Sequence, residues 1–234
     1  SLVEDTSKTS VYLKNLTELG IVEREFSVDA KTKEKANTNR GTYRLTDHFF
    51  RFWYAFGFAN LSQLEDGDVD GVYEYFVKPA LHEFASLAFE DICREFVRGL
   101  QKKNALPFRF AKMGRWTGKT TVRDASAQNG FRTAETEIDL LAIDRDGKNY
   151  LVGECKFRHS PFDYSEYLDT LAKLTPLKEK AKFYYALFSE SGFDKKITAE
   201  AEASESLFLY DLETIVNFGK QRPSCRAQQE HEMR

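Results

Sequence analysis

Acidic side chains interrupt two segments that otherwise have the composition of buried β-strands, ETEIDLLAID at 135–144 and VGECKFR at 152–158. Successive strand residues point to opposite faces, so Glu137 and Asp139 should share one face. The apolar residues between them should share the other: Ile138, Leu140 and Ala142. Carboxylates on buried strands are costly unless they are paired or bind a cation, so these acids constrain the fold strongly.

The second segment and the turn between them suggest how the acids meet. Glu154 and Lys156 share a face of the second strand, opposite Cys155. The joining run DRDGKN, residues 144–149, predicts a hairpin. With suitable register, the hairpin brings Asp139 near Glu154 and Lys156. Two interpretations follow, a buried structural ion network or a catalytic metal site.

The metal interpretation assigns a role to each residue. Mg²⁺ or Mn²⁺ would bind the carboxylates of Asp139 and Glu154 and the backbone carbonyl of Cys155. Such an ion makes bound water more acidic and neutralises charge on a scissile phosphate. Lys156 would orient the attacking water or stabilise the phosphorane. The predicted catalytic residues are therefore Asp139, Glu154 and Lys156.

A basic run precedes these strands. Residues 101–132 contain eight basic side chains and one acid, although the whole chain has a formal net charge of −3. A solvated surface would explain such a run, but it also suits an anionic partner. Beside the predicted metal site, we expect this partner to be DNA, with four residues of the run contacting phosphates: Arg109, Lys112, Arg115 and Lys119.

The run GRWTGKTT, residues 114–121, resembles the end of a P-loop. A P-loop needs one more residue between its glycines, and Met113 stands at the position of the first. No apolar helix follows to supply the helix N-terminus that binds phosphate. We therefore expect a turn after a strand at 107–116, and no ATP site within the chain.

The N-terminal residues predict part of a winged helix. A helix at 5–19 ends at Gly20, and strands at 21–26 and 42–45 enclose a polar tip. Its candidate DNA contacts are Lys8, Lys14 and Arg40. Residues 1–48 contain eight basic and eight acidic side chains, so a protein contact is equally open.

The remaining pattern predicts a mixed α/β fold. We expect a buried aromatic helix at 46–58, with an exposed base-stacking platform as the alternative, and a boundary in the acidic run at 64–71. A long helix follows Pro79. The later elements are strands at 137–144 and 149–157, a helix at 164–180, and strands at 183–189 and 206–212. The predicted domains are 1–63, 72–219 and a polar tail at 220–234.

Asp139 followed by Glu154-Cys155-Lys156 resembles the D…(D/E)-x-K signature of the restriction-endonuclease-like superfamily. Residues 41–210 more narrowly resemble the nuclease-like C-terminal domain of archaeal-type P-loop ATPases. The residues that carry this likeness are Gly41–Leu45, Arg51–Trp53, Phe89–Glu90, Gly114–Trp116, Glu137–Asp139 and Gly153–Lys156. Ile138 stands where the best-known superfamily motif has proline. The resemblance implies a mixed sheet flanked by helices, preceded by a partial winged helix.

The resemblance also implies a role for Glu90, the helix carboxylate that completes the metal site in similar nucleases. A helical wheel places Glu90 nearly opposite an apolar stripe through Leu81, Ala88 and Ile92. A solvated acid and a metal ligand therefore both stay open for Glu90. For Glu137 we expect a salt bridge or a supporting role.

Two functions follow from these patterns. The first is Mg²⁺-dependent hydrolysis of DNA phosphodiester bonds by a domain of a larger ATPase. The alternative is an inactive nuclease-like module that binds DNA or protein and regulates that ATPase. The chain begins without Met, so we expect a fragment whose partners include its own N-terminal ATPase domain, and further copies of the chain as an open possibility. No long apolar stretch predicts a membrane span, and three scattered cysteines favour reduced thiols in the cytoplasm.

Overall fold

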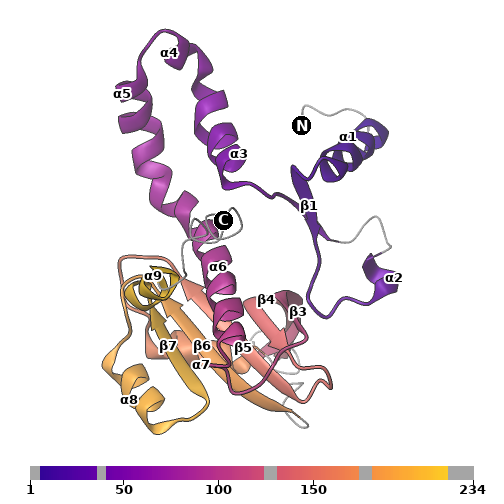
Figure 1. The fold of residues 1–234 in the computed structure, drawn as a ribbon, viewed down its shortest axis with the longest axis vertical. Coiled ribbons are helices and arrows are strands. Elements are labelled where there is room, and N and C mark those ends of the chain that lie inside the picture. The colour runs from indigo at the N-terminus through magenta and orange to yellow at the C-terminus, as the bar shows by residue number, and fades with distance from the viewer. Residues whose placement is uncertain (1–5, 36–40, 124–130, 174–180, 221–234) are drawn as a thin grey trace, which may run out of the picture. The chain divides into compact units, whose positions relative to one another are not determined.

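The structure is a computed structural model that describes residues 6–35, 41–123, 131–173 and 181–220 (Figure 1). The chain divides into two compact units, an N-terminal unit of residues 1–84 and a C-terminal unit of residues 85–234. The acidic run at 64–71 lies inside the N-terminal unit, around the turn between two short helices. Among the described helices, none combines the length and apolar character needed to cross a bilayer.

The N-terminal unit begins with a helix and a two-stranded antiparallel ribbon, as predicted. The helix ends at Glu18, and the φ of 71° at Gly20 lets the backbone N–H groups of Gly20 and Ile21 donate to carbonyls of the last helical turn. Assignment of this segment to a winged helix stays a prediction. Its elements are α1 (Thr6–Glu18), β1 (Val22–Glu25), α2 (Thr32–Lys35) and β2 (Thr42–Leu45).

A helical hairpin completes this unit (Figure 1). Its small core contains Phe56, Val72 and Val77, and the Phe84 ring centroid lies 5.3 Å from that of Phe56. The expected burial of the aromatic run is wrong for most of its rings, because two helices cover only one side of each other; Phe49 is 68% and Phe58 is 60% exposed. The elements are α3 (His48–Phe52), the π-helical turn η1 (Trp53–Gly57), the 3₁₀ turn η2 (Phe58–Asn60), α4 (Leu61–Glu65), α5 (Val69–Val72), the π-helical turn η3 (Tyr73–Val77) and the start of α6 (Lys78–Lys102).

A five-stranded mixed sheet forms the C-terminal unit, in the order β3-β4-β5-β6-β7. The first three strands are an antiparallel meander, whereas β5, β6 and β7 are parallel. The predicted mixed α/β fold, with a sheet flanked by helices, is confirmed. The strands are β3 (Lys112–Arg123), β4 (Phe131–Ile143), β5 (Asn149–Lys156), β6 (Lys182–Ser189) and β7 (Leu207–Asp211).

Helices cover both faces of the sheet. One face packs against α6 and α9 through a core that includes Phe96, Leu140 and Phe188. On the other face, Tyr167 of α7 contacts Tyr185 of β6 with ring centroids 6.2 Å apart. The helices that follow the meander are α7 (Tyr164–Ala172), α8 (Lys195–Ala203) and α9 (Leu212–Lys220).

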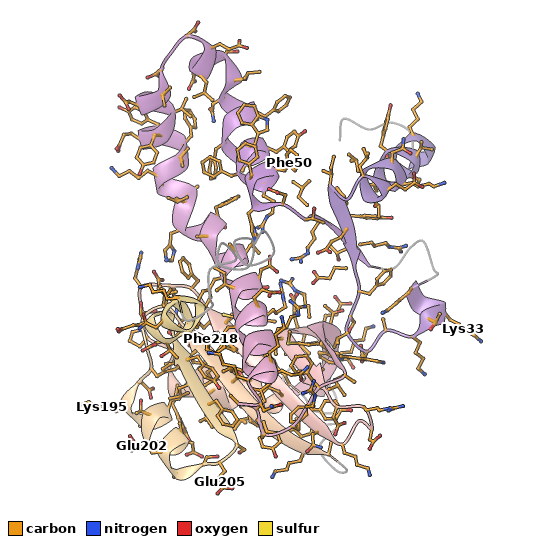
Figure 2. The ribbon with its side chains drawn as sticks, in the orientation of Figure 1. Lys33, Phe50, Lys195, Glu202, Glu205 and Phe218 are labelled. Carbon is orange, nitrogen blue, oxygen red and sulfur yellow. The ribbon has the colours of Figure 1, made fainter. Side chains whose placement is uncertain are left out.

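Gly99 lets α9 approach α6 closely. A Cβ atom at Gly99 would lie 2.4 Å from the ring of Phe218. Phe218, labelled in Figure 2, also packs edge-on against Phe96 with centroids 5.0 Å apart. The absence of a side chain at Gly99 therefore allows α9, the last described helix, to pack on the core.

Two sequence predictions for this unit need correction. The strand expected at 107–116 begins only at Lys112, because Phe108 and Phe110 pack on the core from a loop. The strand then continues through Gly118 and Lys119, which pair with Thr136 and Glu135, so the expected turn there is wrong. The prediction also missed α8 and α9, whose short apolar faces bury few residues, such as Ile197 and Ile215.

Candidate metal and nuclease site

A β-bulge in β4 positions Asp139. Leu141 and Ile138, three residues apart on β4, lie opposite β3 residues that are only two apart. Ile138 therefore shares a face with Leu141, and the predicted alternation, which grouped Ile138 with Leu140, is wrong here. Bulges redirect side chains and are common beside functional sites.

The side chain of Asp139 links β4 to β5. Backbone pairing between these strands ends with Leu140 opposite Gly153. Beyond that pair, Asp139 Oδ2 accepts a hydrogen bond from the backbone N–H of Cys155 at 2.8 Å. The carboxylate thus takes the place of a ladder bond and lies beside Glu154, and the predicted proximity of these two acids is confirmed.

Two lysines hold the carboxylate of Glu154, which is 6% exposed. Lys156 Nζ lies 3.1 Å from Glu154 Oε1, and Lys173 Nζ lies 2.5 Å from Oε2. Lys173 directly follows α7 and was not predicted. Its sequence signal was only a lysine within the predicted helix at 164–180, which does not specify a contact with β5.

Burial and neighbouring charges set the protonation of these groups. Burial, together with the charge of Glu154, raises the pKa of Asp139 from 3.8 to about 6. The Cys155 N–H and the Lys173 ammonium act in the opposite direction. For Lys156, burial lowers the pKa, but the attraction of Glu154 outweighs it and the pKa is raised overall. Lys156 is therefore a cation at neutral pH, beside two carboxylates that repel each other.

Arg115 joins two of the predicted acids. Its Nη2 donates to Glu90 Oε2, and its Nη1 lies 2.6 Å from Glu137 Oε1. Glu137 therefore has the expected salt bridge. The side chain of Glu90 is 17% exposed, and its charge contributes to the raised pKa of Asp139. Arg115 thus connects β3 to α6 at the edge of the site.

The helical-wheel expectation for Glu90 is wrong. Leu81 and Ile92 are 39% and 48% exposed, so they do not form the buried stripe. The buried face in the C-terminal unit is instead Phe89, Cys93, Phe96, Val97 and Leu100. Because this face is rotated from the predicted stripe, Glu90 lies at its edge and is not a solvated acid. Its role as a metal ligand stays a prediction.

Arg94 is a second residue that sequence reasoning missed. It is 5% exposed, and its Nη1 donates to the backbone carbonyl of Asp139 at 2.9 Å. Its Nη2 donates to Asp91 Oδ1 at 2.5 Å, and its Nη1 lies 3.8 Å from Glu90. The spacing of these three residues on one helix was the available signal. Arg94 ties α6 to the bulge.

Cys155 faces away from the acids, toward the core under α6. Burial raises the pKa of its thiol well above the ordinary value, and contact with Cys93 raises it further. A thiol with a raised pKa is a poor nucleophile, so Cys155 serves the site through its backbone. Its N–H contacts Asp139, and its carbonyl stays a predicted metal ligand.

The predicted DNA contacts do not form one surface. Lys112 and Lys119 are exposed but seven residues apart on β3, so they point to opposite faces. Arg115 shares the face of Lys119 but is paired with acids, and Arg109 lies exposed in the preceding loop. In the N-terminal unit, Lys8 and Lys14 are exposed, whereas Arg40 lies outside the described residues.

The donor atoms fit a hard divalent cation. Asp139 and Glu154 present oxygen ligands from neighbouring strands, and burial together with repulsion from Glu154 raises the pKa of Asp139. A cation between them would relieve that repulsion. Glu90 and the Cys155 carbonyl are further oxygen donors nearby.

A family model and a curated relative match this chain, and both are described without a function. A family model, DUF234, described as archaea bacterial proteins of unknown function, matches residues 53–168. The match includes Asp139, Glu154 and Lys156 and ends before Lys173. The chain is also 32% identical over 211 residues to an uncharacterized protein of Methanocaldococcus jannaschii. This match covers 88% of the chain but only 41% of the relative, so the chain spans well under half of the relative's length.

A search of solved structures returned the crystal structure of a repair endonuclease from Pyrococcus abyssi. The sequences are 20% identical, and the match covers 41% of this chain and 38% of that chain with a TM-score of 0.22. A TM-score this low supports neither a common fold nor a common function. The function must therefore be inferred from the side chains of the site.

Proposed function

We propose that the C-terminal unit hydrolyses DNA phosphodiester bonds with Mg²⁺ or Mn²⁺ held by Asp139 and Glu154. The supporting observation is the approach of two buried carboxylates on neighbouring strands, with Lys156 beside them. A purely structural network gains nothing from placing like charges together. A divalent cation held between the carboxylates, with an ammonium facing the phosphate, would give this arrangement of charges a use.

Each residue has a task in this proposal. Asp139 and Glu154 hold the ion, which would supply charge neutralisation and a more acidic water. Lys156 donates hydrogen bonds toward the phosphate or the attacking water. Arg94 fixes the backbone of Asp139 through its carbonyl, and Arg115 fixes Glu90 and Glu137 at the edge. Exposed cations such as Lys119 contact DNA phosphates.

The whole protein is proposed to be longer than this chain. The M. jannaschii relative extends well beyond the matched region, and the resemblance to archaeal-type ATPases suggests a P-loop ATPase domain for the remainder. Within this chain, the Gly118-Lys119 pair is part of a strand and lacks P-loop geometry. ATP binding therefore belongs to the proposed parent domain.

Cleavage assays test the nuclease proposal directly. The purified chain is incubated with linear, supercoiled and branched DNA in Mg²⁺, Mn²⁺ or EDTA. We expect metal-dependent cleavage that falls about 100-fold or more in Asp139→Asn and Glu154→Gln, because charge stabilisation at the reacting phosphate is removed. Asp146→Asn, the same change in the exposed β4–β5 turn, should cleave normally. Cleavage that persists in Asp139→Asn would identify a contaminant.

One observation favours a second function, an inactive module that binds DNA or protein. Both carboxylate oxygens of Glu154 already contact a lysine, which balances its charge without a metal. This alternative predicts DNA binding in EDTA that Asp139→Asn leaves unchanged, and no cleavage of any substrate.

A further inference from the structure

Lys173 follows helix α7 and reaches the carboxylate of Glu154, and the sequence did not predict this contact. Its Nζ lies 2.5 Å from Glu154 Oε2, the shorter of the two lysine contacts to this carboxylate. The Lys173 side chain is 20% exposed and that of Glu154 is 8% exposed. This ion pair is therefore largely shielded from water, although Lys173 comes from the end of α7 and not from the sheet.

Lys173 also acts on the second carboxylate. Its charge lowers the pKa of Asp139, opposing the effects of burial and of Glu154. One ammonium thus influences both proposed metal ligands. In the absence of a metal, two buried carboxylates need such a counter-charge, since an uncompensated buried charge is strongly destabilising.

An ammonium and a divalent cation compete for the same carboxylate oxygens. Glu154 Oε1 contacts Lys156 and Oε2 contacts Lys173, so a divalent cation that coordinates either oxygen lies close to an ammonium that repels it. Lys156 is only two residues away on the same strand and remains beside Glu154 in either case. Lys173 lies on a different element and can withdraw without moving β5.

We propose that the Lys173 ammonium is a built-in counter-ion that occupies the cation position beside Asp139 and Glu154 and releases Glu154 when a divalent cation binds. This inference rests on the proposed function and adds regulation of metal affinity. Lys173 stabilises the metal-free fold and weakens metal binding by the same contact. Metal affinity is thereby set by a residue that is not a ligand.

Metal titration of Lys173→Gln tests the inference without requiring activity. Mn²⁺ binding is measured by calorimetry and by the electron paramagnetic resonance signal of free Mn²⁺. We expect Lys173→Gln to bind Mn²⁺ at least about fivefold more tightly than the wild type, the lower end of typical couplings between two binding events. Lys195→Gln, on the exposed surface of α8 (Figure 2), should bind as the wild type does.

The outcomes separate this inference from the proposed function. Wild-type binding that disappears in Asp139→Asn but is unchanged in Lys173→Gln would overturn the counter-ion role and leave the metal site standing. Failure of both the wild type and Lys173→Gln to bind Mn²⁺ would overturn the metal site and the inference together.

A second measurement uses the unmodified side chains, in case Lys173→Gln does not fold. The wild type is treated briefly with a lysine-directed acylating reagent, with Mg²⁺ or with EDTA, and each lysine is quantified by peptide mass spectrometry. Release from Glu154 predicts faster acylation of Lys173 in Mg²⁺ and an unchanged rate at Lys195. Equal or slower acylation of Lys173 in Mg²⁺ would contradict the inference.

Discussion

Asp139 is the residue at which burial and charge conflict most clearly. It lies in a bulge, its carboxylate accepts a backbone hydrogen bond, and burial together with Glu154 raises its pKa to about 6. A neutral side chain would fit this environment better at neutral pH. Functional sites commonly retain such groups at a cost in stability, because the charge is needed for binding or chemistry.

The raised pKa of Asp139 predicts that the stability difference between the wild type and Asp139→Asn depends on pH. The folded state keeps this proton up to about pH 6, whereas the unfolded chain loses it near 3.8. The contribution of Asp139 to the free energy of unfolding therefore falls as the pH rises from about 3.8 to about 6. In EDTA, Asp139→Asn should be more stable than the wild type at pH 7.5, by up to about 3 kcal/mol, and equal to it near pH 4.

Urea denaturation at both pH values measures this difference. Asp146→Asn controls for the removal of one exposed carboxylate and should show little change at either pH. A destabilised Asp139→Asn at pH 7.5 would mean that the hydrogen bond to Cys155 outweighs the cost of the buried charge.

At the scale of elements, two sides of helix α6 make chemically different contacts with the sheet. Its buried face, including Phe89 and Phe96, packs on the sheet. Its edge carries Glu90 and Arg94 to the bulge of β4. Helix and strand are thus joined by the hydrogen bond from Arg94 to the Asp139 carbonyl, at the point where the β4–β5 ladder ends, and the position of Asp139 depends on α6.

Two arginines one helical turn apart on α6 allow a matched comparison. Arg94 pairs with Asp91 and Arg98 pairs with Glu95, each at 2.5 Å and with the same spacing. The Arg94 side chain is 6% exposed, whereas that of Arg98 is 46% exposed. Arg94→Ala should lower the free energy of unfolding by about 3–5 kcal/mol, because two partly buried acids and the backbone carbonyl of Asp139 lose their partner.

The exposed pair should contribute far less. Arg98→Ala is expected to cost no more than about 1 kcal/mol, since water screens and replaces that contact. Urea midpoints and m-values compare the two variants under one condition. Similar destabilisation in both would show that Arg94 does not organise the bulge.

At the scale of the whole molecule, a formal net charge of −3 must be reconciled with a proposed DNA partner. The cations that remain exposed and close to the sheet edge are distributed over both faces of β3 and the loop before it. Binding through such scattered contacts is electrostatic and independent of base sequence, and it is therefore salt-dependent.

A triple substitution tests this surface. Changing Arg109, Lys112 and Lys119 to Gln should weaken DNA binding and reduce the slope of log affinity against log salt by about one for each phosphate that the protein no longer neutralises. A charge-matched control changes exposed lysines elsewhere: Lys148, Lys195 and Lys220. Fluorescence anisotropy across a salt series compares the two proteins. Equal slopes would exclude β3 and its loop as the DNA-binding surface.

Local patterns in the chain were enough to predict the mixed fold, the helix-then-ribbon start and the proximity of Asp139 to Glu154. Those patterns are strand alternation, the DRDGKN turn and the glycine that ends α1. They involve neighbours in the chain, or strands joined by a short hairpin, and such contacts can be deduced from spacing.

The side chains that surround Asp139 and Glu154 are determined by how elements far apart in the chain pack together. The bulge at Asp139 depends on register against β3, and the contacts of Lys173, Arg94 and Arg115 join elements far apart in the chain. The buried stripe of α6 and the exposure of the aromatic run depend on which surfaces other elements cover. Sequence spacing does not determine such packing, because burial is a property of the assembled elements and not of one segment.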